Sequence, residues 1–323
     1  MSRAPTGAES EAEILARLAR RRSRRAWRQR NFIFPLQAGL VRAALALGRR
    51  MPIDWVSAFG SFCGSLLGRL VPRMVRDIEA RLIDLGWPAE AAHRGAREAV
   101  KNLGRTLAEY AVVQRLWDAG RVRNNLSEEL EAALRSGRPV LVVSGHFSNW
   151  EALLVTASGI GLRIGVFYRP QKNPVIDAIL KRIRRRFVTA LMEKGPRGLR
   201  DAVSHLREGN AVGILVDERT AGEVSMPSKT KEPGLPLRIA VRLARASGAV
   251  LLPVRLAREG GARFVLTGAT PLALPATASE SDELAVACWI DRWLAAQVAA
   301  QPTDWAWIGR VDNLKARISG RAS

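Results

Sequence analysis

Residues 140–151, VLVVSGHFSNWE, contain the transition that decides the fold of this chain. The first four of these residues are a compact aliphatic and β-branched run, which is typical of a strand buried on both faces. Gly145 allows the backbone to turn tightly, and a helical stretch at 150–157 follows at once. This segment therefore predicts a buried strand that ends in a tight turn at the start of a helix.

The same strand-like pattern returns downstream at residues 164–167, 211–216 and 249–254. Helices are expected between these runs at 175–190, 197–207 and 237–246. Strands that alternate with helices predict an α/β fold with a mostly parallel sheet and crossover helices on both faces. Residues 264–267 are expected to add an antiparallel edge strand, and a last helix at 283–300 precedes the aromatic tail 305–307.

The part of the chain before residue 138 has a helical pattern, at 75–119 with an interruption at Gly86-Trp87-Pro88 and again at 126–135. We expect three units along the chain. They are a basic arm at 1–30, helices that associate with a membrane at 31–72, and a main domain at 73–323. Within the main domain we expect a helical part at 73–137, an α/β core at 138–270, and a C-terminal helix and tail at 271–323.

The composition is that of a globular protein. With 323 residues, 25% of them charged and 47% apolar, the chain is not a disordered tail, a collagen-like fibre or a polytopic membrane protein. A formal net charge of +21 predicts an anionic partner, which can be nucleic acid, an anionic membrane surface or an acidic protein. Two cysteines, Cys63 and Cys288, are too few for a disulfide framework or a structural zinc site. We expect no metal site, since no ligand cluster is visible in the sequence.

Two apolar runs near the N-terminus favour attachment to a membrane. Residues 31–48 carry one charge, Arg42, and residues 55–68 carry none. Neither reaches the ~18 charge-free residues of a clear spanning helix, whereas arginines gain about 1 kcal/mol each on anionic headgroups. We therefore expect helices that lie in the interface on the cytoplasmic side, because no secretory signal is apparent. A single marginal span and a soluble first domain are the alternatives.

His146 and Glu151 lie at the predicted strand-to-helix turn, where ligands of open α/β sheets gather. A carboxylate near an imidazole fixes its tautomer and stabilises its protonated form, which makes the imidazole a better general base. The other interpretation is a histidine that caps the helix and a glutamate favoured in the first turn by the helix dipole. On spacing alone, that second interpretation is favoured.

Residues 145–151, GHFSNWE, resemble the GHxxNWE signature of the bacterial lipid A late acyltransferases, which make lauroyl and myristoyl transfers. The resemblance continues in order through VFYRP at 166–170, Asn173-Pro174 with Asp177, the basic residues Arg182, Arg184, Arg185 and Arg186, EGNAVGILVD at 208–217, and LARASGA at 243–249 with Leu252-Pro253. It covers roughly residues 139–257. One motif would be weak, but five in sequence are strong.

The resemblance implies an O-acyltransferase that moves a fatty acyl chain from acyl carrier protein, or from coenzyme A, to a hydroxyl of a lipid A precursor or related glycolipid. It implies no cofactor besides the thioester donor. The implied partners are anionic membrane lipid, the glycolipid and acyl carrier protein, with no specific nucleic acid, at the cytoplasmic face of the cell inner membrane. By resemblance the catalytic residues are His146, Glu151, Arg184 and Asp217, and the substrate-binding residues are Asn149, Tyr168, Arg169 and Arg186.

The resemblance also assigns roles to the catalytic residues. His146 would deprotonate the acceptor hydroxyl, and Glu151 would orient His146. Arg184 would hold a phosphate or the developing oxyanion, with Arg186 as the fallback, and Asp217 would orient Arg184 or the acceptor. The alternatives are that Arg184 is one of several solvated basic residues and that Asp217 is a helix cap.

The chain departs from the family pattern at two places. Residues 224–233, VSMPSKTKEP, lack the two aromatic residues usual after the aspartate, and Gly309 stands where a histidine is common. These departures leave the acceptor and the acyl length open. A glycerophospholipid acyltransferase is an alternative, although its motif usually has aspartate in place of Glu151. A non-catalytic basic protein that binds membranes or nucleic acid is another, although the sequence has no zinc-finger spacing or RNP-like motif.

Overall fold

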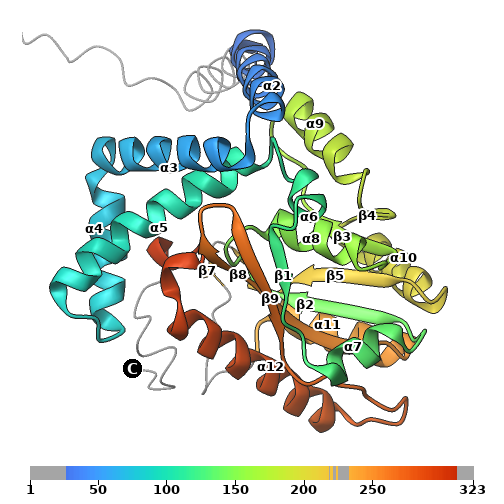
Figure 1. The fold of residues 1–323 in the computed structure, drawn as a ribbon. Helices are drawn as coiled ribbons and strands as arrows, with labels where there is room; N and C mark the ends of the chain where they lie inside the picture. Colours follow the sequence, from blue (N-terminus) through green and yellow to red (C-terminus); the bar gives the residue numbers. More distant parts are fainter. Residues whose placement is uncertain (1–26, 218, 221–222, 225–232, 311–323) are drawn as a thin grey trace, which may run out of the picture.

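The computed structural model describes residues 27–217, 219–220, 223–224 and 233–310. A seven-stranded sheet forms its centre, with the order β1-β9-β8-β2-β5-β3-β4 (Figure 1). The strands are β1 Val122–Asn124, β2 Val140–Ser144, β3 Ile164–Tyr168, β4 Ala190–Glu193, β5 Ala211–Leu215, β8 Val250–Gly260 and β9 Arg263–Gly268. All neighbouring pairs are parallel except β8 and β9, which confirms the predicted mostly parallel sheet.

Helices cover both faces of the sheet and the N-terminal side of the molecule. Their bounds are η1 Gln29–Ile33, α2 Phe34–Arg50, α3 Ile53–Leu70, α4 Pro72–Asp84, α5 Ala89–Glu109, α6 Arg115–Asp118, α7 Glu128–Arg135, α8 Trp150–Gly159, α9 Pro174–Arg184, α10 Pro196–Arg207, α11 Leu235–Ser247, α12 Glu280–Ala300, η2 Pro302–Asp304 and η3 Ile308–Arg310. Two short strands, β6 Arg219–Thr220 and β7 Glu223–Val224, pair with each other outside the main sheet.

Two details of the predicted sheet are wrong. The strand predicted at 264–267 is present as β9, but it is not an edge strand, because β1 pairs with it on its outer side. β1 itself was not predicted; it lies between the helices predicted at 75–119 and 126–135. The helix predicted at 175–190 ends at Arg184, and Ala190 begins β4 at the opposite edge. Both missed strands have only three or four residues, which is too short for an apolar period to stand out.

Alternate residues of β2 face two different cores. Leu141 and Val143 pack in the cluster that includes side chains of α10, α11 and α12. Val140 and Val142 pack in the cluster that includes side chains of α7, α8 and α9. Because both faces of the strand are covered, its sequence is continuously apolar and does not alternate. The predicted placement of crossover helices on both faces is confirmed.

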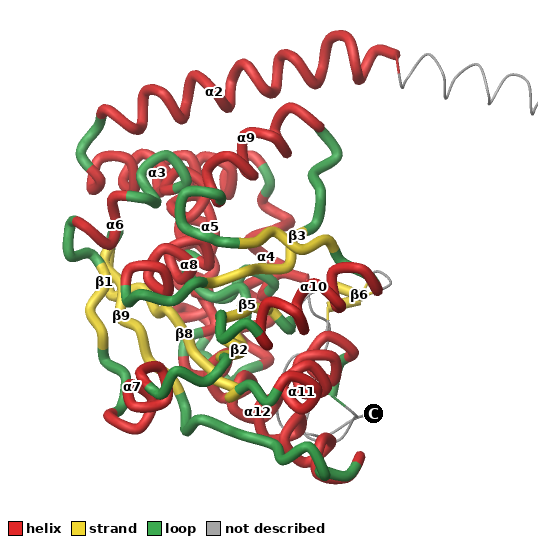
Figure 2. The backbone as a smooth tube through the Cα atoms, turned by 90° about the vertical axis from the view of Figure 1, so that its right-hand side faces the viewer, coloured by secondary structure: helices red, strands yellow, loops and turns green. Residues whose placement is uncertain are grey.

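η1 and α2 together form a helix over residues 29–50 that is long and apolar enough to cross a membrane. At about 1.5 Å per residue, its 22 residues correspond to about 33 Å, close to the ~30 Å hydrocarbon thickness of a bilayer. Figure 2 shows α2 lying across one end of the molecule beyond α3 and α9. Of the predicted basic arm, residues 1–26 lie outside the described residues.

α3 packs against α5 through glycines. A Cβ atom on Gly60 would lie 2.6 Å from the carbonyl oxygen of Gly104, and one on Gly64 would lie 2.5 Å from that of Val100. Only glycine permits so close an approach of the two helices. The opposite side of α3 is solvent-exposed and carries large apolar residues, with exposed fractions of 44–67%. We call this the α3 apolar face, which consists of Trp55, Phe59, Phe62 and Leu66.

Candidate active site

The candidate active site begins at the paired carboxyl ends of β2 and β5. Ser144, the last residue of β2, is the register partner of Leu215, the last residue of β5. The amide of Val216 continues this ladder by donating to the carbonyl oxygen of Ser144 over 3.0 Å. His146 and Asp217 each come two residues after these strand ends, so the sheet delivers them to the same place. This is the edge at which open α/β sheets bind ligands.

His146 and Asp217 form a closely paired imidazole and carboxylate. Nδ1 of His146 lies 2.7 Å from Oδ1 of Asp217, and the His146 amide donates to Oδ2 over 2.7 Å. Burial by itself would raise the pKa of Asp217, but the adjacent His146 and the hydrogen bonds from His146 and Trp305 lower this pKa below its ordinary value. An ionised carboxylate only accepts hydrogen bonds, so Nδ1 of His146 carries a proton, and Nε2 is the ring nitrogen that does not contact Asp217.

Glu151 has other partners than the one predicted. Its carboxylate, in a side chain only 1% exposed, accepts hydrogen bonds from Nε and Nη2 of Arg184 and from the Tyr110 hydroxyl, the first over 2.9 Å and the last over 2.7 Å. Within the described ranges, no hydrogen bond joins Glu151 to His146. Glu151 lies in the first turn of α8, where α9 and the end of α5 supply its partners, and its orientation of His146 stays a prediction.

Arg184 is mostly buried beside the Glu151 carboxylate. Burial works against its charge, but the hydrogen bonds and charge of Glu151 raise the pKa of the guanidinium above its usual value. The predicted pairing of Arg184 with Asp217 is not formed, since each has found another partner. Burial also raises the pKa of Tyr110, so its hydroxyl keeps the proton that it donates to Glu151.

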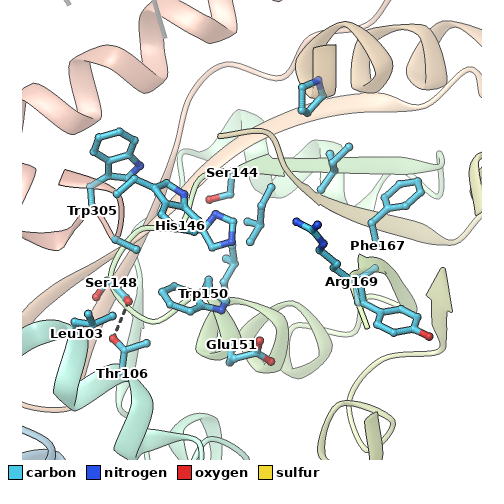
Figure 3. Close-up of a pocket in the computed structure, with 18 of the residues that line it drawn as sticks. Leu103, Thr106, Ser144, His146, Ser148, Trp150, Glu151, Phe167, Arg169 and Trp305 are labelled. Atoms are coloured by element: carbon cyan, nitrogen blue, oxygen red, sulfur yellow. Dashed lines mark hydrogen bonds between the residues drawn. The ribbon is translucent and has the colours of Figure 1, made fainter. Parts of the chain in front are cut away.

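A cavity of about 1510 Å³ opens beside His146 (Figure 3). It exceeds the range of roughly 300–1,000 Å³ that is usual for small-molecule pockets. Its lining includes His146, Trp150, Glu151, Arg169 and Arg184. The apolar part of its wall comes from α4 and α5 and from the sheet, with Met74, Ile78, Leu103, Val142, Ile164 and Val166. Among the described residues, no group of three His, Cys, Asp or Glu side chains is placed to hold a metal ion.

The four predicted substrate-binding residues divide into two pairs. Arg169 and Tyr168 line the cavity, and Figure 3 shows the Arg169 side chain directed into it. The Tyr168 hydroxyl donates to Glu193 over 2.6 Å. Asn149 and Arg186 are not part of this lining, and their role in binding substrate stays a prediction.

Asn149 and Arg186 have other contacts instead. Asn149 is 0% exposed; it caps α8 by accepting from the Ala152 amide over 3.0 Å and donates to Glu109 over 2.8 Å. A residue with both amide atoms occupied inside the protein supports the turn and does not face a substrate. Arg186 is exposed and donates to Gln114 over 2.6 Å.

The turn between β2 and α8 is strained and tightly supported. A Cβ atom on Gly145 would lie 2.9 Å from Oδ2 of Asp217, so glycine is required there. Ser148 has a φ of 48°, which is uncommon for a residue other than glycine. Its carbonyl oxygen accepts from the Thr106 hydroxyl of α5 over 2.9 Å, the bond drawn dashed in Figure 3.

Three aromatic residues of the site were not assigned a role from the sequence. The Trp307 ring lies edge-on to the His146 ring, with 5.1 Å between centroids, and Trp305 donates from Nε1 to Asp217. Both belong to the aromatic tail, which the sequence marked only as a pattern. The third is Tyr110. The chain has two tyrosines, Tyr110 and Tyr168, and both line the cavity. The rarity of tyrosine in this chain is the feature of the sequence that could have drawn attention to Tyr110.

A sequence model of the family described as bacterial lipid A biosynthesis acyltransferase matches residues 27–311. A lipid A biosynthesis acyltransferase of Haemophilus influenzae is 28% identical over 138 residues, so the match spans 39% of this chain and 40% of that protein's length. A crystal structure of the 1-acyl-sn-glycerophosphate acyltransferase from Thermotoga maritima aligns with 76% of this chain and 96% of its own, at 14% identity and a TM-score of 0.39.

Proposed function

The chain belongs to the bacterial lipid A biosynthesis acyltransferase family and is an acyltransferase, and on that basis we propose that it acylates a hydroxyl of a lipid A precursor or a related glycolipid. The donor is a fatty acyl thioester of acyl carrier protein or of coenzyme A. The observation that carries the proposal is the pairing of His146 with Asp217 at the wall of a large, partly apolar cavity.

The proposed reaction uses Nε2 of His146 as the general base. It takes the proton of the acceptor hydroxyl while that oxygen attacks the thioester carbonyl carbon, so a C–O bond forms and the carbonyl oxygen becomes negative. When the intermediate collapses, the C–S bond breaks and the departing sulfur takes the proton back from the imidazolium. The products are an ester and a free thiol. Asp217 stays ionised and stabilises the imidazolium throughout.

Arg169 is our choice for the group that faces negative charge on the substrates. Its side chain is directed into the cavity and belongs to the cavity lining. A guanidinium stays charged and presents several donors, which suits a phosphate or the developing oxyanion. Arg184 is less suited to this role, because the Glu151 carboxylate already neutralises it. We assign the Arg184–Glu151 pair to shaping the cavity wall between α8 and α9.

The acceptor and the acyl chain would reach the cavity from a membrane surface. The α3 apolar face continues to the exposed residues Leu70 and Val71, and Val71 is itself part of the cavity lining. Leu107 of α5, also exposed, lines the same cavity. Exposed large apolar residues that lead into a cavity are typical of a site that takes its substrate from lipid. We place the protein at the cytoplasmic face of the inner membrane, with the helix at 29–50 as a further attachment.

The test is direct transfer. Purified full-length protein is incubated with an acyl thioester and with a lipid A precursor in mixed micelles, and the mass of the lipid product is measured by mass spectrometry. We expect one acyl chain added per transfer, an equal amount of free thiol, and loss of both in His146→Ala. The matched control is His93→Ala, since His93 lies on α5 with its Nδ1 atom 3.1 Å from a carboxylate oxygen of Glu79 and is not among the cavity residues. Thiol release without lipid acylation, or acylation of a lysophospholipid alone, would refute the proposed acceptor.

A further inference from the structure

Trp305 lies directly behind the His146–Asp217 pair. Its indole Nε1 donates to Oδ2 of Asp217 over 2.8 Å. The same oxygen accepts from the His146 amide, and Oδ1 accepts from Nδ1 of His146, so both oxygens of the carboxylate are held. Trp305 is 1% exposed and Asp217 is 3% exposed. A hydrogen bond to an ionised carboxylate in such a dry place is strong, because water cannot replace it.

The backbone around Trp305 also holds the turn that carries His146. The amide of Ser148 donates to the Asp304 carbonyl oxygen over 2.6 Å, and the amide of Ala306 donates to the His146 carbonyl oxygen over 3.0 Å. Phe147 and Trp305 form an antiparallel bridge between these two segments. The tail therefore contacts His146 through its backbone and Asp217 through the indole at the same time.

The tail segment is itself anchored to the rest of the protein. The Asp304 carboxylate accepts from the backbone amide of Arg258 in β8 over 3.1 Å and from the Asn102 amide group of α5 over 3.2 Å. Arg258 in turn pairs with the fully buried Glu109, which also accepts from Asn149. The same buried hydrogen-bond network therefore holds both the segment that carries Trp305 and the strained turn that carries His146.

We propose that Trp305 is a positioning residue for the reaction, which fixes the orientation of the Asp217 carboxylate and, through it, the tautomer and direction of the His146 ring. The inference rests on the proposed role of His146 as general base. Trp305 belongs to the cavity lining, but in this scheme its indole N–H acts through the Asp217 carboxylate, which accepts hydrogen bonds from both the indole and the imidazole. Without the indole donor, Oδ2 keeps a single hydrogen bond and the carboxylate can rotate away from Nδ1.

The kinetic test is Trp305→Phe, which removes the N–H group and keeps an aromatic ring. We expect kcat to fall by about tenfold to a hundredfold, which corresponds to the free energy of one hydrogen bond to a charged group. We expect KM to stay within about twofold of the native value. The matched control is Trp293→Phe, which removes the same group from a half-buried tryptophan of α12 outside the cavity lining. It is expected to keep the native kcat. Equal kcat in native protein and Trp305→Phe would overturn the proposal.

A second measurement does not depend on transfer activity. The chain has three histidines, so the ring N–H protons of ¹⁵N-histidine-labelled protein can be assigned with His146→Asn. We expect a protected Nδ1 proton of His146 that exchanges with water faster in Trp305→Phe than in Trp293→Phe. If this occurs without any acyl transfer, the positioning role stands and the proposed function fails. If the exchange is unchanged in Trp305→Phe, the positioning role is refuted even where transfer is confirmed.

A third measurement needs no Trp305 variant, in case Trp305→Phe does not fold. The indole N–H resonance of Trp305 is compared between the native protein and Asp217→Asn. We expect a shift of that resonance with the other tryptophan N–H signals in place, because the charged acceptor has been replaced by an amide. An unmoved Trp305 signal would overturn the proposal.

Discussion

Nδ1 of His146 and Oδ1 of Asp217 lie 2.7 Å apart, although 71 residues of chain separate them. Both residues follow paired strand ends by the same number of positions, so the sheet fixes their separation. Glu151, five residues from His146, instead meets Arg184 and Tyr110. The two buried carboxylates thus have different partners, and variants of each should fail in different ways.

Asp217→Asn should abolish most of the activity. An asparagine amide in this place donates to Nδ1, which puts the ring proton on Nε2 and removes the proposed general base. We expect kcat to fall by about 10⁴-fold, the size seen when the aspartate of a serine-protease triad is replaced in the same way. Steady-state kinetics on protein with a native circular dichroism spectrum checks this. Asp201→Asn, on α10 and exposed, is the control, and a variant at position 217 with more than a tenth of the native rate would speak against the assignment.

Glu151→Gln should damage stability more than it damages the proton transfer. It leaves the mostly buried Arg184 without its counter-charge, which costs about 3–5 kcal/mol when one partner of a buried pair is removed. Urea denaturation measures this loss. The double variant Glu151→Gln, Arg184→Gln is expected to be less destabilised than the sum of the two single variants, because the second change removes the uncompensated charge. A Glu151→Gln protein of native stability that has lost its activity would instead assign Glu151 to the chemistry.

The pH dependence of stability should reveal Asp217. Its folded pKa lies below the ordinary value, so its ionised form stabilises the fold. This contribution is fully present above the unfolded pKa of about 3.9 and is lost as the pH falls through the lower folded pKa. Asp217→Asn is therefore expected to be less stable than the native protein at pH 7 and pH 5, with the difference narrowing below about pH 4. Denaturation curves at pH 7, 5 and 3.5 test this, and a difference that does not narrow would contradict it.

The sequence predicted the local features of the site and not its long-range pairing. The run at 140–143, Gly145 and His146 were identified because strand pattern, turn residue and side-chain chemistry are all local properties. The carboxylate partner of His146 depends on which strand pairs with β2. The next strand along the chain is β3, but in the sheet β5 lies between β2 and β3. The spacing of apolar residues predicts where strands occur and not the order in which they pair.

The supporting residues were harder still to predict. Trp305 and Asp304 reach the turn from the far end of the chain, and Glu109 reaches it from the end of α5. Their roles come from buried hydrogen bonds between segments that are distant in sequence, which leave no spacing to recognise. The edge strands β1 and β4 were missed for a different reason. Their strand pattern depends only on neighbouring residues, but each strand is too short for the pattern to be recognised.

Gly145→Ala should impair the reaction because the added methyl group would collide with neighbouring side chains, and not because alanine cannot adopt the backbone conformation of Gly145. The added methyl group would lie 2.9 Å from Oδ2 of Asp217 and 2.7 Å from the Phe147 ring, so the carboxylate has to move. We expect kcat to fall by about tenfold or more, since a small misplacement of a catalytic group is costly. Gly39→Ala in α2, where a Cβ atom meets nothing within 4 Å, is the matched control. Native activity in Gly145→Ala would show that the site tolerates a displaced Asp217.

The α3 apolar face should determine how tightly the protein holds a membrane. Phe59→Glu with Phe62→Glu places two charges where we expect acyl chains, and burying one such side chain is worth about 1.5–3 kcal/mol. We therefore expect binding to anionic phospholipid vesicles to weaken by about a hundredfold or more in a flotation assay. Leu284→Glu, an exposed leucine of α12, is the control for the added charge and should bind as the native protein does. If the double variant floats as well as the native protein, the helix at 29–50 alone attaches the protein and the α3 apolar face has no part in it.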